Sequence, residues 1–204
     1  MKLCRAHDVT IIEDDVYALA ATAGAPPLAM LAPERTFYVN GLSKTLSPGL
    51  RIGVLAPPPG LVEQAETVLR ATALMVSPLS CVVMEQWLAD GIAAVVTASI
   101  RVEAARRRSL AASVLGEAMV HPSRDGFHVW LPMTRARAEQ VTLAAAATGI
   151  AVTPPGAIAT APDRVESGIR LCLGGPPLAD LARALGMLAK MLARPEGHSP
   201  HVSG

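Results

Sequence analysis

Two short runs rich in β-branched and aromatic residues, residues 9–12 (VTII) and 36–39 (TFYV), each end abruptly at polar residues. Runs of this length and composition predict buried β-strands. A third strand is predicted over residues 51–55, where the proline run at 57–59 ends it. Because helical patterns follow these strands along the chain, the sequence predicts an α/β fold.

Helical patterns occupy the middle of the chain. They cover residues 61–116, with breaks at the Ser77-Pro78 step and near Gly91. The stretch 92–115 is long enough to bridge two domains. This organisation predicts two parts joined by one long helix.

Short strands and helices alternate in the C-terminal part. We expect strands over residues 126–131, ended by Pro132, and over 150–153 and 169–173, with a helix over 135–148. A final amphipathic helix carries its apolar residues along one face. These residues are Leu178, Leu181, Leu185, Leu188 and Leu192.

Side chains that can do chemistry stand at the ends of the first three strands. Asp14 and Tyr17 follow the first strand, Lys44 follows the second, and Arg51 begins the third. Singly, each has a structural explanation, such as a solvated loop lysine. In open α/β sheets, however, ligands bind at the carboxyl ends of the strands. Together these residues suit one ligand that carries an aldehyde, a ring nitrogen, a phenolic oxygen and a phosphate.

Four segments carry a resemblance to a known family. Residues 11–17 (IIEDDVY) and 43–53 (SKTLSPGLRIG) resemble the signature of class I and II pyridoxal-phosphate-dependent aminotransferases. With residues 126–133 (GFHVWLPM) and 170–175 (RLCLGG), the chain more closely resembles the aminotransferase-like domain of MocR-type regulators of the GntR group. The resemblance runs to about Arg194.

The resemblance implies an α/β PLP-dependent transferase fold of the aspartate aminotransferase type. Residues 1–90 would form the C-terminal part of an incomplete large, cofactor-binding domain, and residues 91–194 a small α+β domain with its connecting helix. Residues 195–204 would be a disordered tail. A phosphate-binding glycine loop, a ring-stacking aromatic residue, an asparagine and a winged helix-turn-helix precede these segments in relatives. The expectation is therefore that this chain is the C-terminal portion of such a protein.

Site residues follow from the resemblance position by position. Lys44 matches the lysine that forms the internal aldimine with pyridoxal 5′-phosphate and then moves a proton as base and acid. Asp14 matches the aspartate that pairs with the pyridine nitrogen, and Asp15 is the alternative for that role. Tyr17 matches the tyrosine that binds the cofactor's phenolic oxygen.

Three further residues match ligands of the anionic groups. Ser43 and Arg51 correspond to the family's phosphate ligands, and a guanidinium can hold a phosphate through two hydrogen bonds. Arg170 corresponds to the arginine that binds the α-carboxylate of the substrate.

The implied function is amino-group transfer between an amino acid and a 2-oxo acid, provided that the missing N-terminal half is supplied. The alternatives are an effector-sensing domain of a MocR/GntR-type regulator, and an inactive truncated fragment. The resemblance also implies a homodimer in intact relatives.

Composition excludes several other classes. The net charge of +1 and the 3% aromatic content argue against direct nucleic-acid binding by this chain. Cys4, Cys81 and Cys172 are too widely spaced to suggest a metal site or a disulfide framework, so no metal is predicted. The longest uncharged run, residues 71–84, is too short to span a membrane. We therefore expect a soluble, cytoplasmic protein.

Overall fold

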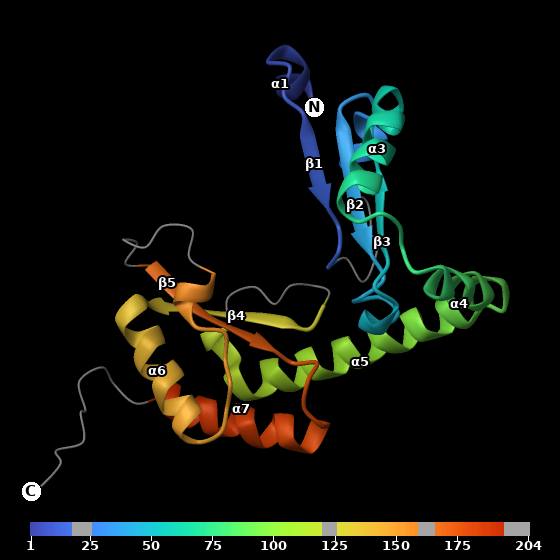
Figure 1. Ribbon diagram of the computed structural model, residues 1–204. Coiled ribbons are helices and arrows are strands. Elements are labelled where there is room, and N and C mark those ends of the chain that lie inside the picture. Colours follow the sequence, from blue (N-terminus) through green and yellow to red (C-terminus); the bar gives the residue numbers. More distant parts are fainter. Residues whose placement is uncertain (18–25, 120–125, 159–165, 194–204) are drawn as a thin grey trace, which may run out of the picture. The chain divides into compact units, whose positions relative to one another are not determined.

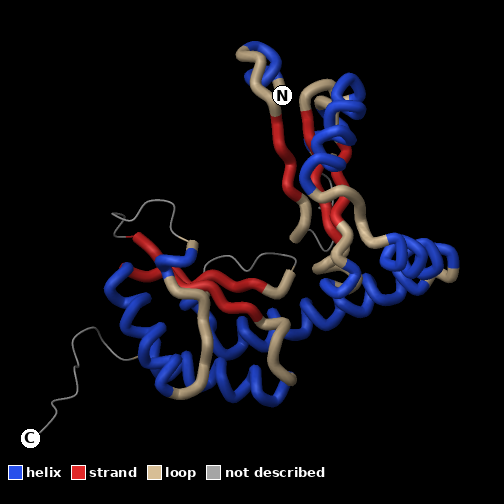
Figure 2. Tube along the Cα trace, in the orientation of Figure 1, coloured by secondary structure: helices blue, strands red, loops and turns tan. Residues whose placement is uncertain are grey.

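A computed structural model describes residues 1–17, 26–119, 126–158 and 166–193. The chain forms two compact units, Met1–Arg101 and Val102–Gly204, and the boundary falls within helix α5 (Ile92–Leu115) (Figure 1). Each unit has its own small sheet (Figure 2). The predicted tail at 195–204 lies outside the described residues.

The first unit is built around a three-stranded sheet in the order β1-β2-β3. Strand β1 runs parallel to β2, and β3 runs antiparallel to β2. Its elements besides α5 are α1 (Lys2–Ala6), β1 (Ile11–Asp14), α2 (Leu28–Leu31), β2 (Thr36–Gly41), η1 (Pro48–Leu50), β3 (Gly53–Ala56), η2 (Pro59–Leu61), α3 (Val62–Thr72) and α4 (Pro78–Ala89).

The antiparallel direction of β3 follows from the connection that precedes it. Residues 42–52 contain only the short helix η1, whereas a parallel partner needs a crossover of about a dozen residues or more. The chain therefore turns back beside β2. All three strands exist where β-branched runs predicted them, but their bounds differ.

The predicted start of the third strand was wrong. Arg51 has left-handed backbone angles, φ 54° and ψ 36°, at the end of η1, so the strand begins at Gly53. The first strand is also displaced from its predicted position. Val9 N–H bonds to Cys4 O in the turn after α1, and pairing with β2 runs from Ile11 to Asp14.

The second unit packs helices against one face of a two-stranded antiparallel sheet. Its elements are η3 (Gly116–Ala118), β4 (His128–Thr134), α6 (Arg135–Ala147), η4 (Pro155–Ala157), β5 (Glu166–Cys172) and α7 (Leu178–Leu192). Helix α7 confirms the predicted leucine stripe, because Leu181, Leu185 and Leu188 are buried. These leucines pack in one core with the C-terminal part of α5, with α6 and with inward-facing residues of both strands (Figure 1).

Two predictions in this unit were wrong. Pro132 does not end its strand, since β4 continues to Thr134. A proline is tolerated on an edge strand because its missing N–H can face away from the ladder, and β4 pairs only with β5 among the described strands. Residues 150–153 form no strand, only an isolated bridge from Thr153 to Arg170.

Within the described residues, no single helix is long and apolar enough to cross a membrane. Helix α4 and the helical stretch Ile92–Ala118 meet that test only as a pair bent by 84°.

Candidate functional site

Strands β1 and β2 bring the predicted site residues of the first unit to one end of the sheet. They are parallel and in register, with Asp14 opposite Val39. Asp14 is the last residue of β1, and Lys44 lies in the turn that follows β2. Because both carboxyl ends lie at the same edge, Asp14, Tyr17, Ser43 and Lys44 start from neighbouring points of the backbone.

The two consecutive aspartates have different surroundings. Asp14 is exposed, and its Oδ1 accepts a hydrogen bond from Val16 N–H at 3.1 Å. Asp15 is half-buried, and its Oδ2 accepts a hydrogen bond from the Tyr38 hydroxyl at 3.0 Å. Asp14 therefore keeps a carboxylate open to a ligand, whereas Asp15 is bonded within the protein. Sequence reasoning favoured Asp14, because Tyr17 follows it by three residues, and kept Asp15 as the alternative.

Tyr17 and Lys44 are brought together. Lys44 Nζ lies 5.4 Å from the centroid of the Tyr17 ring, and 54% of the Tyr17 side chain is exposed. A cation at this distance interacts favourably with the face of an aromatic ring. The amine and the phenol, which sequence reasoning assigned to one ligand, are thus adjacent.

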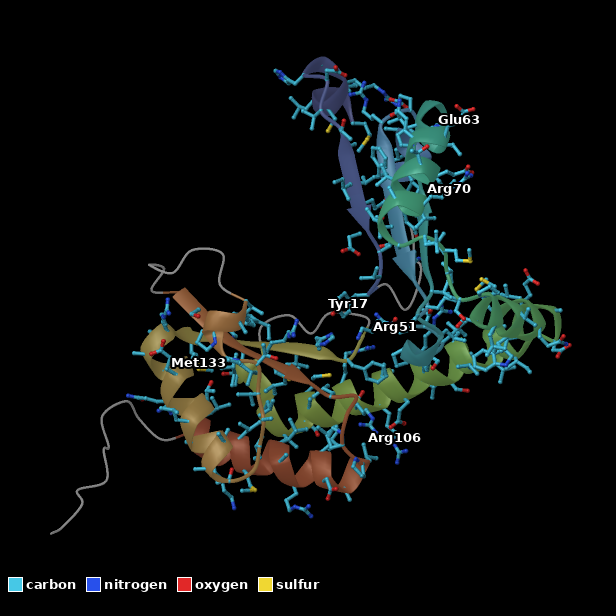
Figure 3. All side chains as sticks on the ribbon, in the orientation of Figure 1. Tyr17, Arg51, Glu63, Arg70, Arg106 and Met133 are labelled. Atoms are coloured by element: carbon cyan, nitrogen blue, oxygen red, sulfur yellow. The ribbon has the colours of Figure 1, made fainter. Side chains whose placement is uncertain are left out.

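A closed loop places Ser43 and Arg51 at its two ends. Leu42 N–H donates to Ile52 O at 3.1 Å and closes the loop, so Ser43 and Arg51, its first and last residues, start from neighbouring points of the backbone. Within the described residues, neither the Ser43 hydroxyl nor the Arg51 guanidinium has a hydrogen-bond partner. Figure 3 shows Arg51 and Tyr17 at the same end of the three-stranded sheet.

The loop is held internally and from α5. Leu46 N–H and Ser47 N–H both donate to Leu42 O, at 2.9 and 3.0 Å. The hydroxyl of Thr97 on α5 lies 3.0 Å from Thr45 O and 2.8 Å from Ala93 O. Sequence reasoning missed Thr97, because nothing local marks a threonine that contacts a loop 52 residues away.

Strand β2 carries two polar residues that sequence reasoning also missed. The Tyr38 hydroxyl accepts from Asn40 Nδ2 at 2.9 Å, and Asn40 Oδ1 accepts from Gly41 N–H at 2.6 Å. Burial is the main cause that raises the pKa of Tyr38; the bond from Asn40 opposes it, and the Asp15 carboxylate raises it further. The presence of two polar residues, Tyr38 and Asn40, in an otherwise apolar strand is the sequence feature that could have identified them.

Glu13 has a structural role. Its two carboxylate oxygens accept from Leu28 N–H and Ala29 N–H, both at 2.8 Å, at the start of α2. Carboxylates stabilise the first turn of a helix by accepting from its free N–H groups. Glu13 is therefore engaged away from the ligand side of Asp14.

Arg170 lies in the second unit, on the face of the two-stranded sheet opposite its core. It stands across from Trp130 in β4, and its backbone bonds to Thr153. The Nε atom of Arg170 is buried and has no hydrogen-bond partner within the described residues. A buried guanidinium nitrogen without a partner is costly unless a ligand supplies an acceptor.

No group of three or more His, Cys, Asp and Glu side chains that could hold a metal ion occurs in the part of the chain that the structure describes.

Family comparison gives one match over most of the chain. The model of the family "Aminotransferase class I and II" matches residues 1–188. Among curated proteins, the uncharacterised HTH-type transcriptional regulator YdfD of Bacillus subtilis is 32% identical over 129 residues, 59% of this chain and 27% of YdfD. The HTH-type pyridoxine biosynthesis transcriptional regulator PdxR of Corynebacterium glutamicum is 28% identical over 134 residues, 62% of this chain and 29% of PdxR.

Solved structures show the same fold at low identity. The α-aminoadipate aminotransferase LysN of Thermus thermophilus, in complex with N-(5′-phosphopyridoxyl)-L-leucine, has a TM-score of 0.81 and 21% identity over 94% of this chain and 52% of LysN. The kynurenine aminotransferase of Pyrococcus horikoshii has a TM-score of 0.78 and 24% identity over 94% of this chain and 49% of that enzyme. The chain thus spans about half of these enzymes and less than a third of YdfD and PdxR.

Proposed function

This chain belongs to the family of class I and class II aminotransferases, and from this premise we propose that it binds pyridoxal 5′-phosphate through Lys44. The observation that carries the proposal is the placement of Lys44 Nζ 5.4 Å from the Tyr17 ring, at the sheet end where Asp14 is exposed. An amine, a phenol and a carboxylate at one edge match the donor set that this cofactor needs. We propose amino-group transfer between an amino acid and a 2-oxo acid as the reaction.

Pyridoxal 5′-phosphate, when bound, supplies an aldehyde that condenses with amines and a ring that accepts electrons from the substrate Cα. Lys44 would bind the cofactor covalently as a neutral amine. Once the amine of the substrate had displaced Lys44 from the cofactor, the freed Nζ would take the proton from the substrate Cα as a base and return it as an acid.

Asp14 and Tyr17 would hold the two polar positions of the ring. The Asp14 carboxylate would pair with the protonated ring nitrogen, because a nearby anion favours the charged form. The Tyr17 hydroxyl would donate to the phenolic oxygen. The exposure of both side chains leaves them accessible to a ligand.

Ser43 and Arg51 would bind the phosphate, and Arg170 the α-carboxylate of the substrate. The closure of the loop between Leu42 and Ile52 supports the first pair. The buried, unpartnered Nε of Arg170 supports the second role. An arginine in this role would select amino acids over simple amines, since only amino acids carry the carboxylate.

A second candidate function is supported by the curated relatives. YdfD and PdxR are HTH-type transcriptional regulators, and PdxR regulates pyridoxine biosynthesis by its name. The chain would then be an effector-sensing domain that binds the cofactor and an amino compound, without nucleic-acid binding of its own. A fragment without activity is the third alternative.

The organisation of the intact protein is also a proposal. We assign residues 1–90 to a partial large domain, 91–194 to a small domain and 195–204 to a tail. We further propose that the protein is cytoplasmic and that it forms a homodimer, as the resemblance implies for intact relatives. The division of the chain into two compact units is compatible with this assignment.

The test uses the few lysines of this sequence, Lys2, Lys44 and Lys190. The chain is mixed with pyridoxal 5′-phosphate, its visible absorbance is measured, and borohydride is added before peptide mapping. We expect the label on the peptide that contains Lys44, and its loss together with the absorbance in Lys44→Ala. Lys2→Ala and Lys190→Ala are the matched controls.

Equal labelling of the three lysines, or unchanged absorbance in Lys44→Ala, would show that the site assignment is wrong. To separate enzyme from sensor, the loaded chain is incubated with a mixture of amino acids. Mass spectrometry then detects pyridoxamine 5′-phosphate if the amino group is transferred. A sensor would bind without producing it.

A further inference from the structure

We propose that Asp15, Tyr38 and Asn40, called here the strand-end network, position Asp14 and Lys44 relative to one another for cofactor binding. This inference rests on the proposed function of Lys44. It assigns a positioning role to three residues that do not themselves contact the cofactor, and it gives Asp15 a role different from that of a ring-nitrogen partner.

The strand-end network connects the two strands that carry the site. Tyr38 OH donates to Asp15 Oδ2 at 3.0 Å and accepts from Asn40 Nδ2 at 2.9 Å. Asn40 Oδ1 in turn accepts from Gly41 N–H at 2.6 Å. A continuous series of hydrogen bonds therefore runs from Asp15, just after β1, to Gly41, the last residue of β2 before the loop that carries Lys44.

The backbone extends the same link. Asp15 N–H donates to Val39 O at 2.8 Å, which continues the parallel pairing of β1 and β2 one residue beyond β1. A Cβ atom built on Gly41 would lie 3.7 Å from Val16 Cγ1 and 3.7 Å from Ile52 O. Val16, which follows Asp15, thus lies near Gly41, where the loop of residues 42–52 leaves the sheet.

Each end of the network adjoins a proposed cofactor ligand. Asp14 immediately precedes Asp15, and Tyr17 follows two residues after it. On the other strand, Lys44 follows Asn40 by four residues, through a loop whose ends are bonded at Leu42 and Ile52. Site residues work only when neighbouring residues hold their geometry to within a fraction of an ångström.

The alternation of a β-strand explains why the network includes Asp15 and excludes Asp14. Consecutive side chains point to opposite faces, so Asp15 shares a face with Tyr38 and Asn40, and Asp14 points the other way. A phenol is protonated at neutral pH, and burial raises the pKa of Tyr38 further, so its hydroxyl remains a donor to the carboxylate. Removing that hydroxyl leaves a half-buried carboxylate without its partner.

The test compares Tyr38→Phe, Asp15→Ala and Asp15→Asn with Thr36→Val. Thr36 is a control in the same strand, because its buried hydroxyl also donates a hydrogen bond, to Ala32 O at 2.8 Å, but at the other end of β2. We expect Tyr38→Phe and Asp15→Ala to weaken binding of pyridoxal 5′-phosphate about 10-fold. Asp15→Asn, which still accepts from Tyr38, should stay within about threefold of the wild type, and Thr36→Val should bind as the wild type does.

A second measurement needs no cofactor. Amide hydrogen exchange of residues 41–46 should become faster in Tyr38→Phe and stay unchanged in Thr36→Val. Thermal unfolding of each variant separates this local effect from a general loss of stability. If wild-type protein fails to bind the cofactor at all, the proposed function is wrong, and the exchange data still decide whether the network positions the loop.

Two results would overturn the inference. One is Tyr38→Phe with wild-type affinity and wild-type exchange over residues 41–46. The other is an equal loss of affinity in Asp15→Asn and Asp15→Ala, which would mean that the negative charge of Asp15, and not its hydrogen bond, is needed.

Discussion

The conformation of Arg51 allows its contribution to stability to be separated from its contribution to binding. Its backbone lies in the left-handed region, at φ 54° and ψ 36°, and its side chain is exposed. This conformation costs a residue with a side chain about 1–2 kcal/mol. A residue kept at such a position despite the cost is a candidate for function. We therefore examine the substitution Arg51→Gly.

Arg51→Gly removes this conformational cost, which stabilises the folded state. It also makes the unfolded chain more flexible, and this cancels about 0.5–1 kcal/mol of the gain in stability. The free energy of unfolding should then rise by about 0–1.5 kcal/mol. Binding should change in the opposite direction. A hydrogen bond to a charged group contributes about 1.5–3 kcal/mol, so affinity for pyridoxal 5′-phosphate should fall about 10- to 100-fold.

The assay combines urea unfolding with titration of two ligands. Pyridoxal lacks the phosphate, so its affinity should be the same for the wild type and for Arg51→Gly. Arg51→Ala is the control that removes the guanidinium and keeps the left-handed residue, and it should lose binding without gaining stability. The reasoning is refuted if Arg51→Gly is clearly less stable than the wild type, or if both ligands lose affinity equally.

Two further predictions concern stability. A Cβ on Gly168 would collide with the Leu131 carbonyl oxygen and the Trp130 ring, so Gly168→Ala should lower the unfolding free energy by about 1–3 kcal/mol in urea, whereas Gly175→Ala, with open space around it, should not. The hydrogen bond from Arg5 lowers the pKa of Glu34 to about 2 from 4.5. This stabilisation is present above the usual carboxyl pKa and disappears as the pH falls through about 2, so the small, salt-sensitive difference in stability between the wild type and Glu34→Gln should vanish in acid.

Local sequence predicted those elements whose causes are local. Apolar β-branched runs predicted that β1 and β2 exist, although β1 begins two residues later than expected, and proline and glycine marked the breaks around α4. The strong apolar stripe of α7 gave its buried face. The family motif around Lys44 gave the candidate site, whose residue roles stay a prediction; the structure places Lys44 Nζ 5.4 Å from the centroid of the Tyr17 ring.

What could not be predicted depends on contacts between distant residues. Pro132 lies inside β4 because that strand pairs on one side only among the described strands. Residues 150–153 have the composition of a strand, but only Thr153 finds a partner, at Arg170. The left-handed backbone of Arg51 follows from the closure of a loop between Leu42 and Ile52, and no pattern in the sequence reports it.

The choice between Asp14 and Asp15 shows how far a local sequence pattern can predict the site. The two-residue period of a strand says that the two carboxylates face opposite sides, but it does not say which side carries the ligand. A residue of another strand, 23 positions from Asp15, distinguishes the surroundings of the two, because the Tyr38 hydroxyl bonds to Asp15 whereas Asp14 is exposed; this favours Asp14 as the ligand, which stays a prediction. With phenylalanine at position 38, Asp15 would be half-buried without that donor, which costs free energy. Tyr38 is therefore the feature that gives the two adjacent acids different surroundings.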